Sequence, residues 1–255
     1  MYAEERHQAI AALMRETGRV SVADVAERFE VTAETARRDL AVLERTGLLR
    51  RVHGGAVATS ALTMIESGVA ERDSTRAAQK SEIAKAAVAL LPLTGGAVLL
   101  DAGTTTARLA SLMPVDRELF VATNSLGIAG RLAGLGGLDL RLIGGRVRGV
   151  TQACVGDETV RALADLRFDV AFLGANAVSA THGLTTPDPD EAAVKRAMTR
   201  SARHVVVLAD SSKLGDEHLV RFAAIEEVDT LVTDDEADED QLAELREHGL
   251  EVVVA

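Results

Sequence analysis

The sequence predicts two domains: a small, mainly helical N-terminal domain and a larger C-terminal α/β domain with an open, mostly parallel sheet. Two observations predict this division. Apolar residues recur at helical spacing through the first 45 residues, whereas apolar strands alternate with amphipathic helices from residue 79 onward. Charge divides the 255 residues in the same way, because residues 1–57 hold nine Arg and nine Asp or Glu, and the remainder carries the whole net charge of -11.

Two short helices joined by a tight turn are predicted near the N-terminus. Ser21 is a good N-cap for the first, with Asp24 at its third helical position, and Thr32 is a good N-cap for the second. Gly18 and Gly47 are typical helix ends. In these helices and the one before them, the apolar residues fall on single faces: Ile10, Leu13, Met14, Val22, Val25, Ala26, Phe29, Ala36, Leu40 and Leu43. Such a pair is typical of a helix-turn-helix motif.

The stretch GLLRRVHGGAV predicts a β-hairpin with Gly54 and Gly55 at its turn, which would make the motif a winged helix-turn-helix. In this motif the second helix lies in the major groove, with its first turns closest to the base edges, while the wing meets the backbone or the minor groove. An arginine can read guanine or hold phosphates, and the sequence leaves open which of its arginines does either.

We therefore expect the N-terminal domain to bind double-stranded DNA. The candidate DNA-binding residues lie at the two N-caps, on the first turns of the second helix and on the wing: Ser21, Thr32, Glu34, Thr35, Arg37, Arg38, Arg50, Arg51, His53 and Gly54. The alternative is a solvated charged helix face, because Asp39 and Glu44 lie nearby and could pair with the arginines.

Composition argues against several other classes of protein. Five Phe, one Tyr and no Trp offer few platforms for stacking single-stranded nucleic acid. The single Cys154 has no metal-site spacing around it, so we expect a buried small side chain, and no metal or cofactor. The N-terminus lacks the apolar segment of a signal peptide, and the most apolar stretch is broken by Pro92, Gly95 and Gly96. We expect a cytoplasmic protein without a membrane span.

Residues 58–76 have no sustained period and are expected to form a linker between domains 1–57 and 77–255. The predicted helices of the second domain span residues 80–91, 105–113, 125–133, 157–166, 190–202 and 238–249. The predicted strands span residues 97–101, 119–124, 138–145, 169–175, 204–210, 230–234 and 250–255. Apolar strands separated by helices imply a sheet covered on both faces.

Polar residues follow several of these strands, and ligands of open α/β sheets bind beyond the carboxyl ends of strands. The segment DAGTTT joins a strand to a helix, and its hydroxyls and free N–H groups could form an anion site that Gly103 opens to close approach. The candidate ligand-binding residues are Asp101, Gly103, Thr104, Thr105, Thr106, Thr123, Asn124, Ser125, Gly144, Gly145, Glu191, Lys195 and Lys213.

Each of these features has a plainer alternative. A threonine could simply cap the helix, and Lys213, which could supply a charge to a phosphate, could be an ordinary surface lysine. Glu191 and Lys195 are four residues apart and could form a solvent-exposed helix pair. The loop is not a Walker A loop, because no Gly-Lys-Ser/Thr follows it.

Residues 21–57 resemble the N-terminal domain of the DeoR/GlpR family of bacterial sugar-metabolism repressors. They carry its signature in RRDL (Arg37 to Leu40), Leu43, Gly47 and RVHGGA (Arg51 to Ala56). With the opening MYAEERHQAI, the domain resembles the fructose-operon repressors of high-GC Gram-positive bacteria. The resemblance implies a phosphorylated sugar as the effector, with fructose 1-phosphate as the first guess.

Residues 79–234 resemble the effector domain of the same family, which is related to ribose-5-phosphate isomerase, through DAGTTT, TNS, GG, GLTTPDPDEAAVKRAM and DSSKLG. In the isomerases a GTT-type loop holds the phosphate and a DGADE-like loop supplies carboxylates for proton transfer. The matching stretch here, LGANA at residues 173–177, has none, so Glu191 would act alone. The resemblance therefore implies a binding pocket and no enzyme. The alternative is a sugar-phosphate isomerase with an autoregulatory DNA-binding head.

Together these features predict a transcriptional repressor of a sugar-utilisation operon that leaves its operator when a phosphorylated sugar fills the C-terminal domain. An activator that needs the effector to bind DNA would have the same two domains, and the family tendency favours repression. Because one recognition helix reads too few bases for operator selectivity, we expect a homo-dimer or higher oligomer.

Overall fold

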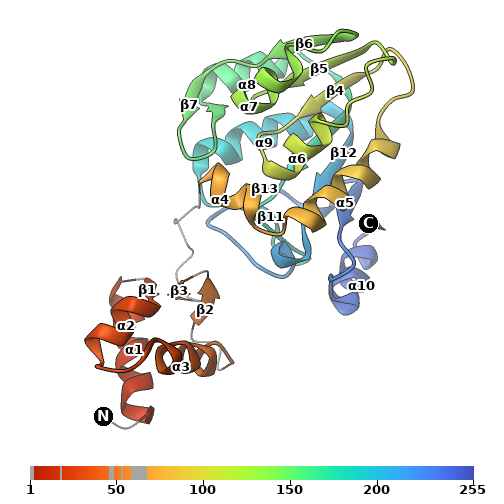
Figure 1. Cartoon of the computed structure of the whole chain (residues 1–255). Helices are drawn as coiled ribbons and strands as arrows, with labels where there is room; N and C mark the ends of the chain where they lie inside the picture. Colours follow the sequence, from red (N-terminus) through yellow and green to blue (C-terminus); the bar gives the residue numbers. More distant parts are fainter. Residues whose placement is uncertain (1–2, 18, 46–48, 53, 59–67) are drawn as a thin grey trace. The chain divides into compact units, whose positions relative to one another are not determined.

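The structure is a computed structural model that describes residues 3–17, 19–45, 49–52, 54–58 and 68–255 (Figure 1). The chain forms two compact units, Met1–Ile65 and Glu66–Ala255, which we call the head and the body.

The head is a winged helix-turn-helix. Its helices are α1 (Ala3–Thr17), α2 (Val22–Arg28) and α3 (Ala33–Arg45). Its strands are β1 (Arg19–Ser21), β2 (Leu49–Val52) and β3 (Gly55–Ala58), which form an antiparallel sheet in the order β1-β3-β2. The apolar faces predicted from the sequence are confirmed, because Ile10, Val25, Ala36 and Leu40 are buried together in one core. β1 is too short, at three residues, to be recognised from its sequence pattern.

The turn of the wing lies one residue earlier than predicted. Val52 pairs with Gly55 in the β2–β3 ladder, so Gly55 belongs to the strand, while Gly54 lies in the turn with a φ of 81°. Gly55 also pairs with Ser21, and a Cβ atom there would lie 2.2 Å from the carbonyl oxygen of Val20. Gly55 is therefore required for close strand packing. The predicted helix ends Gly18 and Gly47 lie outside the described residues.

The core of the body is a seven-stranded sheet in which every paired strand is parallel, as the sequence predicts. Its strands are β4 (Ala97–Leu100), β5 (Leu119–Thr123), β6 (Leu138–Leu142), β9 (Phe168–Gly174), β12 (Ala202–Leu208), β14 (Thr230–Thr233) and β15 (Glu251–Val254). The spatial order is β15-β14-β12-β9-β4-β5-β6. The strand order therefore reverses between β4 and β9, which is the switch point where ligands of doubly wound sheets bind.

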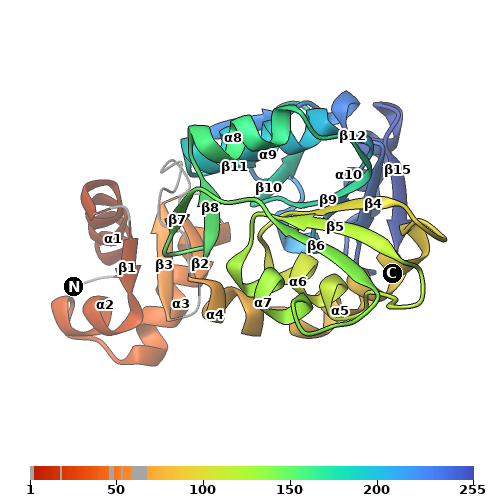
Figure 2. The same cartoon turned by 90° about the horizontal axis from the view of Figure 1, so that it is seen from above.

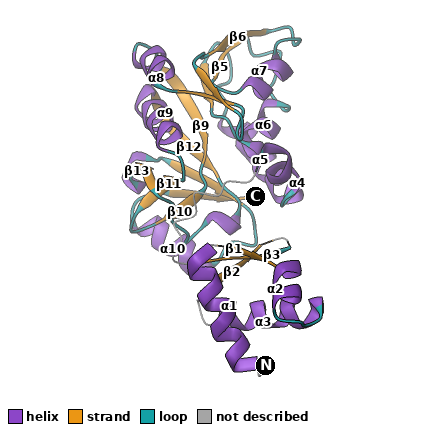
Figure 3. Cartoon of the chain, turned by 90° about the vertical axis from the view of Figure 1, so that its left-hand side faces the viewer, coloured by secondary structure: helices purple, strands orange, loops and turns teal. Residues whose placement is uncertain are grey.

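Helices cover both faces of this sheet (Figures 2 and 3). One face carries α5 (Ala77–Ala87), α6 (Thr104–Ala110) and α7 (Leu126–Leu132), and the other carries α8 (Asp157–Ala164), α9 (Pro189–Ser201) and α10 (Glu239–Glu247). Two separate apolar cores result, one on each side of the sheet. Because both faces are covered, inner strands such as β4 and β5 are continuously apolar, whereas the edge strand β6 alternates leucine with Asp139 and Arg141 and is largely exposed.

Several short elements of the body were not predicted: the strands β7 (Arg146–Arg148), β8 (Ala153–Val155), β10 (Ala177–Ser179), β11 (Gly183–Thr186) and β13 (Val220–Ala223), and the 3-10 turns η2 (Ser211–Lys213) and η3 (Ile225–Glu227). α4 (Val69–Ser74) lies within residues 58–76, and η1 (Val88–Leu90) lies within the helix predicted over residues 80–91. The strands pair antiparallel in two small sheets. Cys154 in β8 is buried, as predicted, and burial raises the pKa of its thiol. None of the described helices is long and apolar enough to cross a membrane.

Candidate functional site

Both helices of the helix-turn-helix begin at the residues that the sequence predicts. The Ser21 hydroxyl accepts a hydrogen bond from the Asp24 backbone N–H at 3.0 Å, and the Asp24 carboxylate accepts one from the Ser21 N–H at 3.2 Å, which completes a capping box. The Thr32 hydroxyl accepts from the Thr35 N–H at 3.2 Å. These contacts satisfy N–H groups that a helix leaves unbonded at its start, so the caps set where α2 and α3 begin.

Asp39 pairs with α1 and not with its neighbours on α3. Its carboxylate accepts hydrogen bonds from Arg6 at 2.5 and 3.0 Å and lies 2.9 Å from the His7 ring. Burial alone would raise the pKa of Asp39, but the hydrogen bonds from Arg6 and His7 bring it below its ordinary value. The alternative in which Asp39 pairs with the arginines beside it is wrong. Within the RRDL signature, Asp39 therefore stabilises the fold of the head by bonding α3 to α1.

The two arginines that precede Asp39 are exposed. Arg37 lies 3.5 Å from Glu34, and both side chains are more than half exposed, so this pair contributes little to stability. Arg38 is exposed as well. Arg50 and Arg51 lie in β2, but their side chains and the whole of His53 fall outside the described residues. Of the four arginines predicted to bind DNA, the structure therefore describes the side chains of Arg37 and Arg38, and both lie at the surface of α3.

Asp101, Lys195 and Gly174 meet at the switch point of the body sheet. Asp101 follows β4, and its Oδ2 atom accepts from the Gly174 N–H, at the end of β9, at 3.0 Å. Lys195 of α9 donates to the same oxygen and, at 2.9 Å, to the Gly174 carbonyl. Asp101 and Lys195 are both buried, and the Lys195 ammonium lies 5.4 Å from the centre of the Phe222 ring. A charge pair thus joins the two strands between which the sheet order reverses.

The three threonines after β4 have different surroundings. Gly103 is the N-cap of α6, so the alternative of a threonine N-cap does not hold. The Thr106 hydroxyl donates to the carbonyls of Asp101, at 2.7 Å, and of Gly103, at 3.0 Å, and so closes the turn. The hydroxyls of Thr104 and Thr105 make no hydrogen bond within the described part of the chain, although both residues are largely buried. Of the three threonine hydroxyls, these two therefore keep hydrogen-bonding capacity that the described part of the chain does not use.

The TNS segment after β5 supports the loop after β4. Asn124 accepts from the Ala102 N–H at 3.0 Å and donates to the Cys154 carbonyl at 3.1 Å, so both ends of its amide are bonded within the protein. Thr123 accepts from the Ser125 N–H, and Ser125 caps α7. These three residues therefore hold the backbone of the loops after β4 and β5.

Glu191 and Lys195 do not pair with each other, and the solvent-exposed pair considered for them is wrong. Glu191 is buried and accepts hydrogen bonds from Thr151 and, at 3.2 Å, from Arg148. Arg148 also pairs with Asp188 at 3.0 Å. Glu191 is therefore bonded to residues 148–151, whereas Lys195 is bonded to Asp101 after β4 and to Gly174 at the end of β9.

Gly144 and Gly145 contact the start of α8. The Gly144 carbonyl accepts from the Thr159 hydroxyl at 2.8 Å, and a Cβ atom on Gly145, whose φ is 153°, would lie 2.1 Å from that hydroxyl. Among the described residues, no hydrogen bond joins Gly144 or Gly145 to Asp101 or to the threonines of α6.

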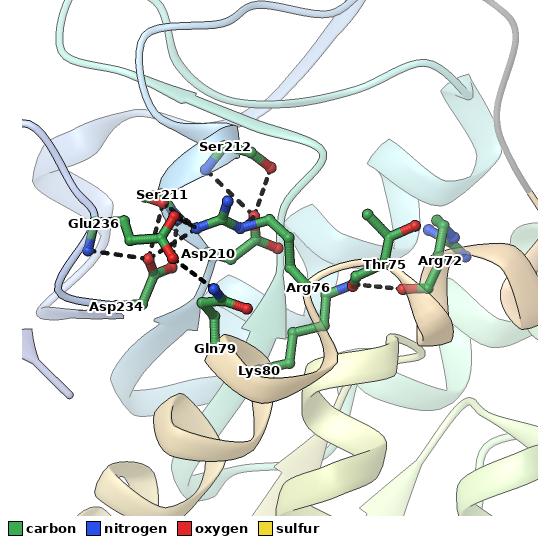
Figure 4. Close-up of polar contacts among 10 residues, drawn as sticks. All are labelled: Arg72, Thr75, Arg76, Gln79, Lys80, Asp210, Ser211, Ser212, Asp234 and Glu236. Carbon is green, nitrogen blue, oxygen red and sulfur yellow. Dashed lines mark hydrogen bonds and ion pairs between the residues drawn. The ribbon is translucent and has the colours of Figure 1, made fainter. Parts of the chain in front are cut away.

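Two basic residues at α5, Arg76 at its N-cap and Lys80 within it, were not predicted from the sequence (Figure 4). Arg76 has a left-handed backbone, with a φ of 52°, and its guanidinium contacts Asp234 at 3.0 Å and Ser211 at 2.7 Å, beside Asp210 and Glu236. Burial alone would raise the pKa of Asp234, but the hydrogen bonds from Ser211 and the charge of Arg76 lower it. This network holds the DSSK segment that contains Lys213.

Lys80 is the second missed residue, and it is buried. It falls on the apolar stripe of α5, at helical spacing from Ile83, Ala84 and Ala87. A charged residue at a core position of an amphipathic helix was the signal that could have found it. Within the described residues no group of three His, Cys, Asp or Glu side chains could hold a metal ion.

Family models match both units of the chain. A DeoR-like helix-turn-helix domain matches residues 6–61, and a DeoR C-terminal sensor domain matches residues 75–235. The chain belongs to the DeoR family. This DeoR-family protein is a DNA-binding transcription regulator with a sensor domain.

Relatives match nearly the whole of the DeoR-family chain. A putative aga operon transcriptional repressor of Escherichia coli O157:H7 is 34% identical over 98% of this chain and 93% of its own length. The transcriptional regulator FruR of Bacillus subtilis is 36% identical over 92% of this chain and 93% of its own. A crystal structure of ribose 5-phosphate isomerase A from Neisseria gonorrhoeae matches 53% of this chain and 52% of that one, with 14% identity and a TM-score of 0.39.

Proposed function

We propose that this DeoR-family regulator represses a sugar-utilisation operon and leaves its operator when a phosphorylated sugar binds the body. The observation that carries the proposal is the pair of unbonded hydroxyls on Thr104 and Thr105, at the carboxyl end of a central parallel strand. Phosphate oxygens accept hydrogen bonds from such hydroxyls and from the N–H groups of the same turn. The names of the relatives, an aga operon repressor and a FruR regulator, favour a sugar-linked signal.

Fructose 1-phosphate is the first candidate effector. Thr104, Thr105 and Lys213 would hold its phosphate, and the region around Asp101 and Asn124 would enclose the sugar. Because Asp101 is bonded to Lys195, and the Asn124 amide to Ala102 and Cys154, we assign these two residues to the walls of the pocket. Glu191, the carboxylate that could serve an isomerase, is bonded to Arg148 and Thr151, which favours binding over proton transfer.

The head would hold operator DNA through α3 and the wing, with Arg37 and Arg38 on the face that enters the major groove. Two heads in a dimer, each neutralising about four phosphates, would give a log–log slope of affinity against salt near -7. A slope near zero, or tight operator binding by a monomer, would contradict this arrangement.

Substitutions in the body test the proposal. Thr105→Ala removes one unbonded hydroxyl and Lys213→Ala removes one charge, and both residues belong to the body. Each variant should bind operator as the unsubstituted chain does and should need far more effector for release. The measurement is an operator titration with and without fructose 1-phosphate and related phosphosugars. If both variants respond at the same effector concentration as the unsubstituted chain, the pocket is elsewhere.

A further inference from the structure

The strand β6 lies at one edge of the seven-stranded sheet, beside α7 (Figure 3). Directly after it, the Ile143 N–H donates to the Thr123 carbonyl of β5 at 2.8 Å. Because the backbone groups of successive strand residues point to opposite sides, those of Leu138, Leu140 and Leu142 point away from β5. Among the described residues no strand pairs with that side of β6, and the strand contains neither proline nor glycine. Such an edge is a template for pairing with another strand.

The side chains of β6 divide between its two faces. Leu138 and Leu140 pack against the core beneath α5, α6 and α7. Asp139 and Arg141 lie on the opposite face and are exposed, and neither side chain has a hydrogen bond or an ion pair in the part of the chain that the structure describes. Charges on an edge strand often prevent pairing with other chains. Here their signs are opposite, so the register decides whether they attract or repel.

One antiparallel register makes β6 complementary to a second copy of itself. A two-fold axis places one residue opposite itself and pairs the residues at equal distances on either side of it. With Leu140 on the axis, Asp139 of one copy faces the partner's Arg141, and Leu138 faces the partner's Leu142. With Asp139 or Arg141 on the axis, like charges would lie directly opposite, which is destabilising. In the favourable register, the outward backbone groups of the three leucines face one another and can form the hydrogen bonds between the strands.

Helix α7 adds a small apolar surface beside the same edge. Arg131 of α7 donates to the Ala107 carbonyl of α6 at 3.2 Å, so it marks the side of α7 that faces α6. Leu126 and Ala133 lie about half-way around the helix from Arg131, on the side of the β6 edge. Ala133 is exposed, and Leu126 is 41% exposed although it is a large apolar residue. A second copy of α7, related by the axis at β6, would cover these two side chains.

We infer that β6 and α7 form an interface between two copies of this chain, in which the two seven-stranded sheets join across a two-fold axis at Leu140. The other edge strand, β15, has the sequence EVVV and lacks a pair of opposite charges. Pairing of β6 with the partner's β15 would be head-to-tail and would not close into a dimer. The inference goes beyond the proposed function, because it names the surface through which two chains associate and does not depend on the effector.

Charge reversal tests the inference. Asp139→Arg and Arg141→Asp each replace two attractive pairs across the axis by two repulsive ones, so each should raise the Kd of the dimer at least ~10-fold. The double variant, Asp139→Arg with Arg141→Asp, restores opposite charges and should return the Kd to within about threefold of that of the unsubstituted chain. The measurement is fluorescence-detected sedimentation of the full chain without DNA, from nanomolar to micromolar concentrations. Both positions are exposed, so the variants should remain folded.

Glu247→Arg is the matched control, because it changes the net charge as Asp139→Arg does. Glu247 is exposed at the end of α10, which packs on β15 at the opposite edge of the sheet. This variant should associate as the unsubstituted chain does. If Glu247→Arg weakens association as much as Asp139→Arg, the effect comes from net charge and the inference is wrong.

The remaining outcomes are equally decisive. An unsubstituted chain that stays monomeric at every concentration would overturn the inference, as would single reversals that associate normally. A double variant as weak as the single variants would show that the two charges do not face each other across an axis. Species that grow without limit with concentration would indicate head-to-tail pairing instead. Release of operator by a phosphosugar is measured separately, so a failed interface would leave the proposed function standing, and a failed effector would leave the interface standing.

Discussion

Replacing Asp39 by Asn should destabilise the head more than any exposed charge change could. The Asp39 carboxylate is 4% exposed and binds an Arg6 that is itself 8% exposed, through two hydrogen bonds. Asn keeps the shape but removes the charge, which leaves the Arg6 guanidinium buried without its counter-ion. Removing one partner of a buried ion pair costs about 3–5 kcal/mol. For a domain of this size, each kcal/mol lowers Tm by about 4–8 °C, so a fall of at least ~12 °C is expected.

Calorimetry of the full chain, with operator binding as a second readout, measures this loss. Glu27→Gln removes an exposed carboxylate from the same domain and should change the stability of the head by less than ~0.5 kcal/mol. An Arg6→Met, Asp39→Leu double variant should recover much of the loss, since an apolar pair leaves no buried charge. A fall of less than ~1 kcal/mol for Asp39→Asn would refute the reasoning, because the pair would then be solvated.

Acid should weaken the head through the same pair. The pKa of Asp39 is lowered in the folded head, so its contribution to stability is present above the unfolded pKa of about 4 and is lost as pH falls through the folded value. The unsubstituted head should lose stability steadily below about pH 5. Asp39→Asn, which cannot titrate at this position, should show a smaller loss over the same range.

Two further substitutions test the assignments in the head and the body. Arg38→Ala should weaken operator binding by about 1–3 kcal/mol if Arg38 reads a base, and an equal loss on operator and random DNA would reassign it to a phosphate contact. Glu191→Gln should lower the stability of the body by about 1–3 kcal/mol, because the Arg148 guanidinium loses a charged acceptor. Calorimetry checks the second prediction. An unchanged unfolding temperature would contradict it, because the ion pair with Asp188 would then be sufficient to stabilise the Arg148 guanidinium.

The sequence predicted the architecture because amphipathic helices have a 3.6-residue apolar period, whereas buried parallel strands appear as short continuous apolar runs between them. The caps at Ser21 and Thr32 were found because capping needs particular side chains at particular spacings. Short antiparallel strands such as β1 and β7 were missed, since three residues are too few to show an alternation. The turn of the wing was placed one residue late because either glycine of the Gly54-Gly55 pair could have supplied the positive φ.

Pairing between distant residues was the part that the sequence could not supply. Local spacing suggested that Glu191 would pair with Lys195 and Asp39 with its neighbouring arginines. In the folded chain, Glu191 finds Arg148, Lys195 finds Asp101 and Asp39 finds Arg6. A buried charge needs a partner that remains bonded out of water, and only the tertiary fold determines which one is within reach.

Operator titration of the unsubstituted chain, with and without fructose 1-phosphate and related phosphosugars, tests the central claim most directly. We expect tight binding to operator that falls steeply with salt and is weakened by one of these phosphosugars, with the unphosphorylated sugar as an inactive control. Linkage requires that the same phosphosugar bind the DNA complex more weakly than the free protein, by the same factor. Operator binding that no phosphosugar changes would contradict the claim that this sensor domain releases DNA in response to a sugar phosphate.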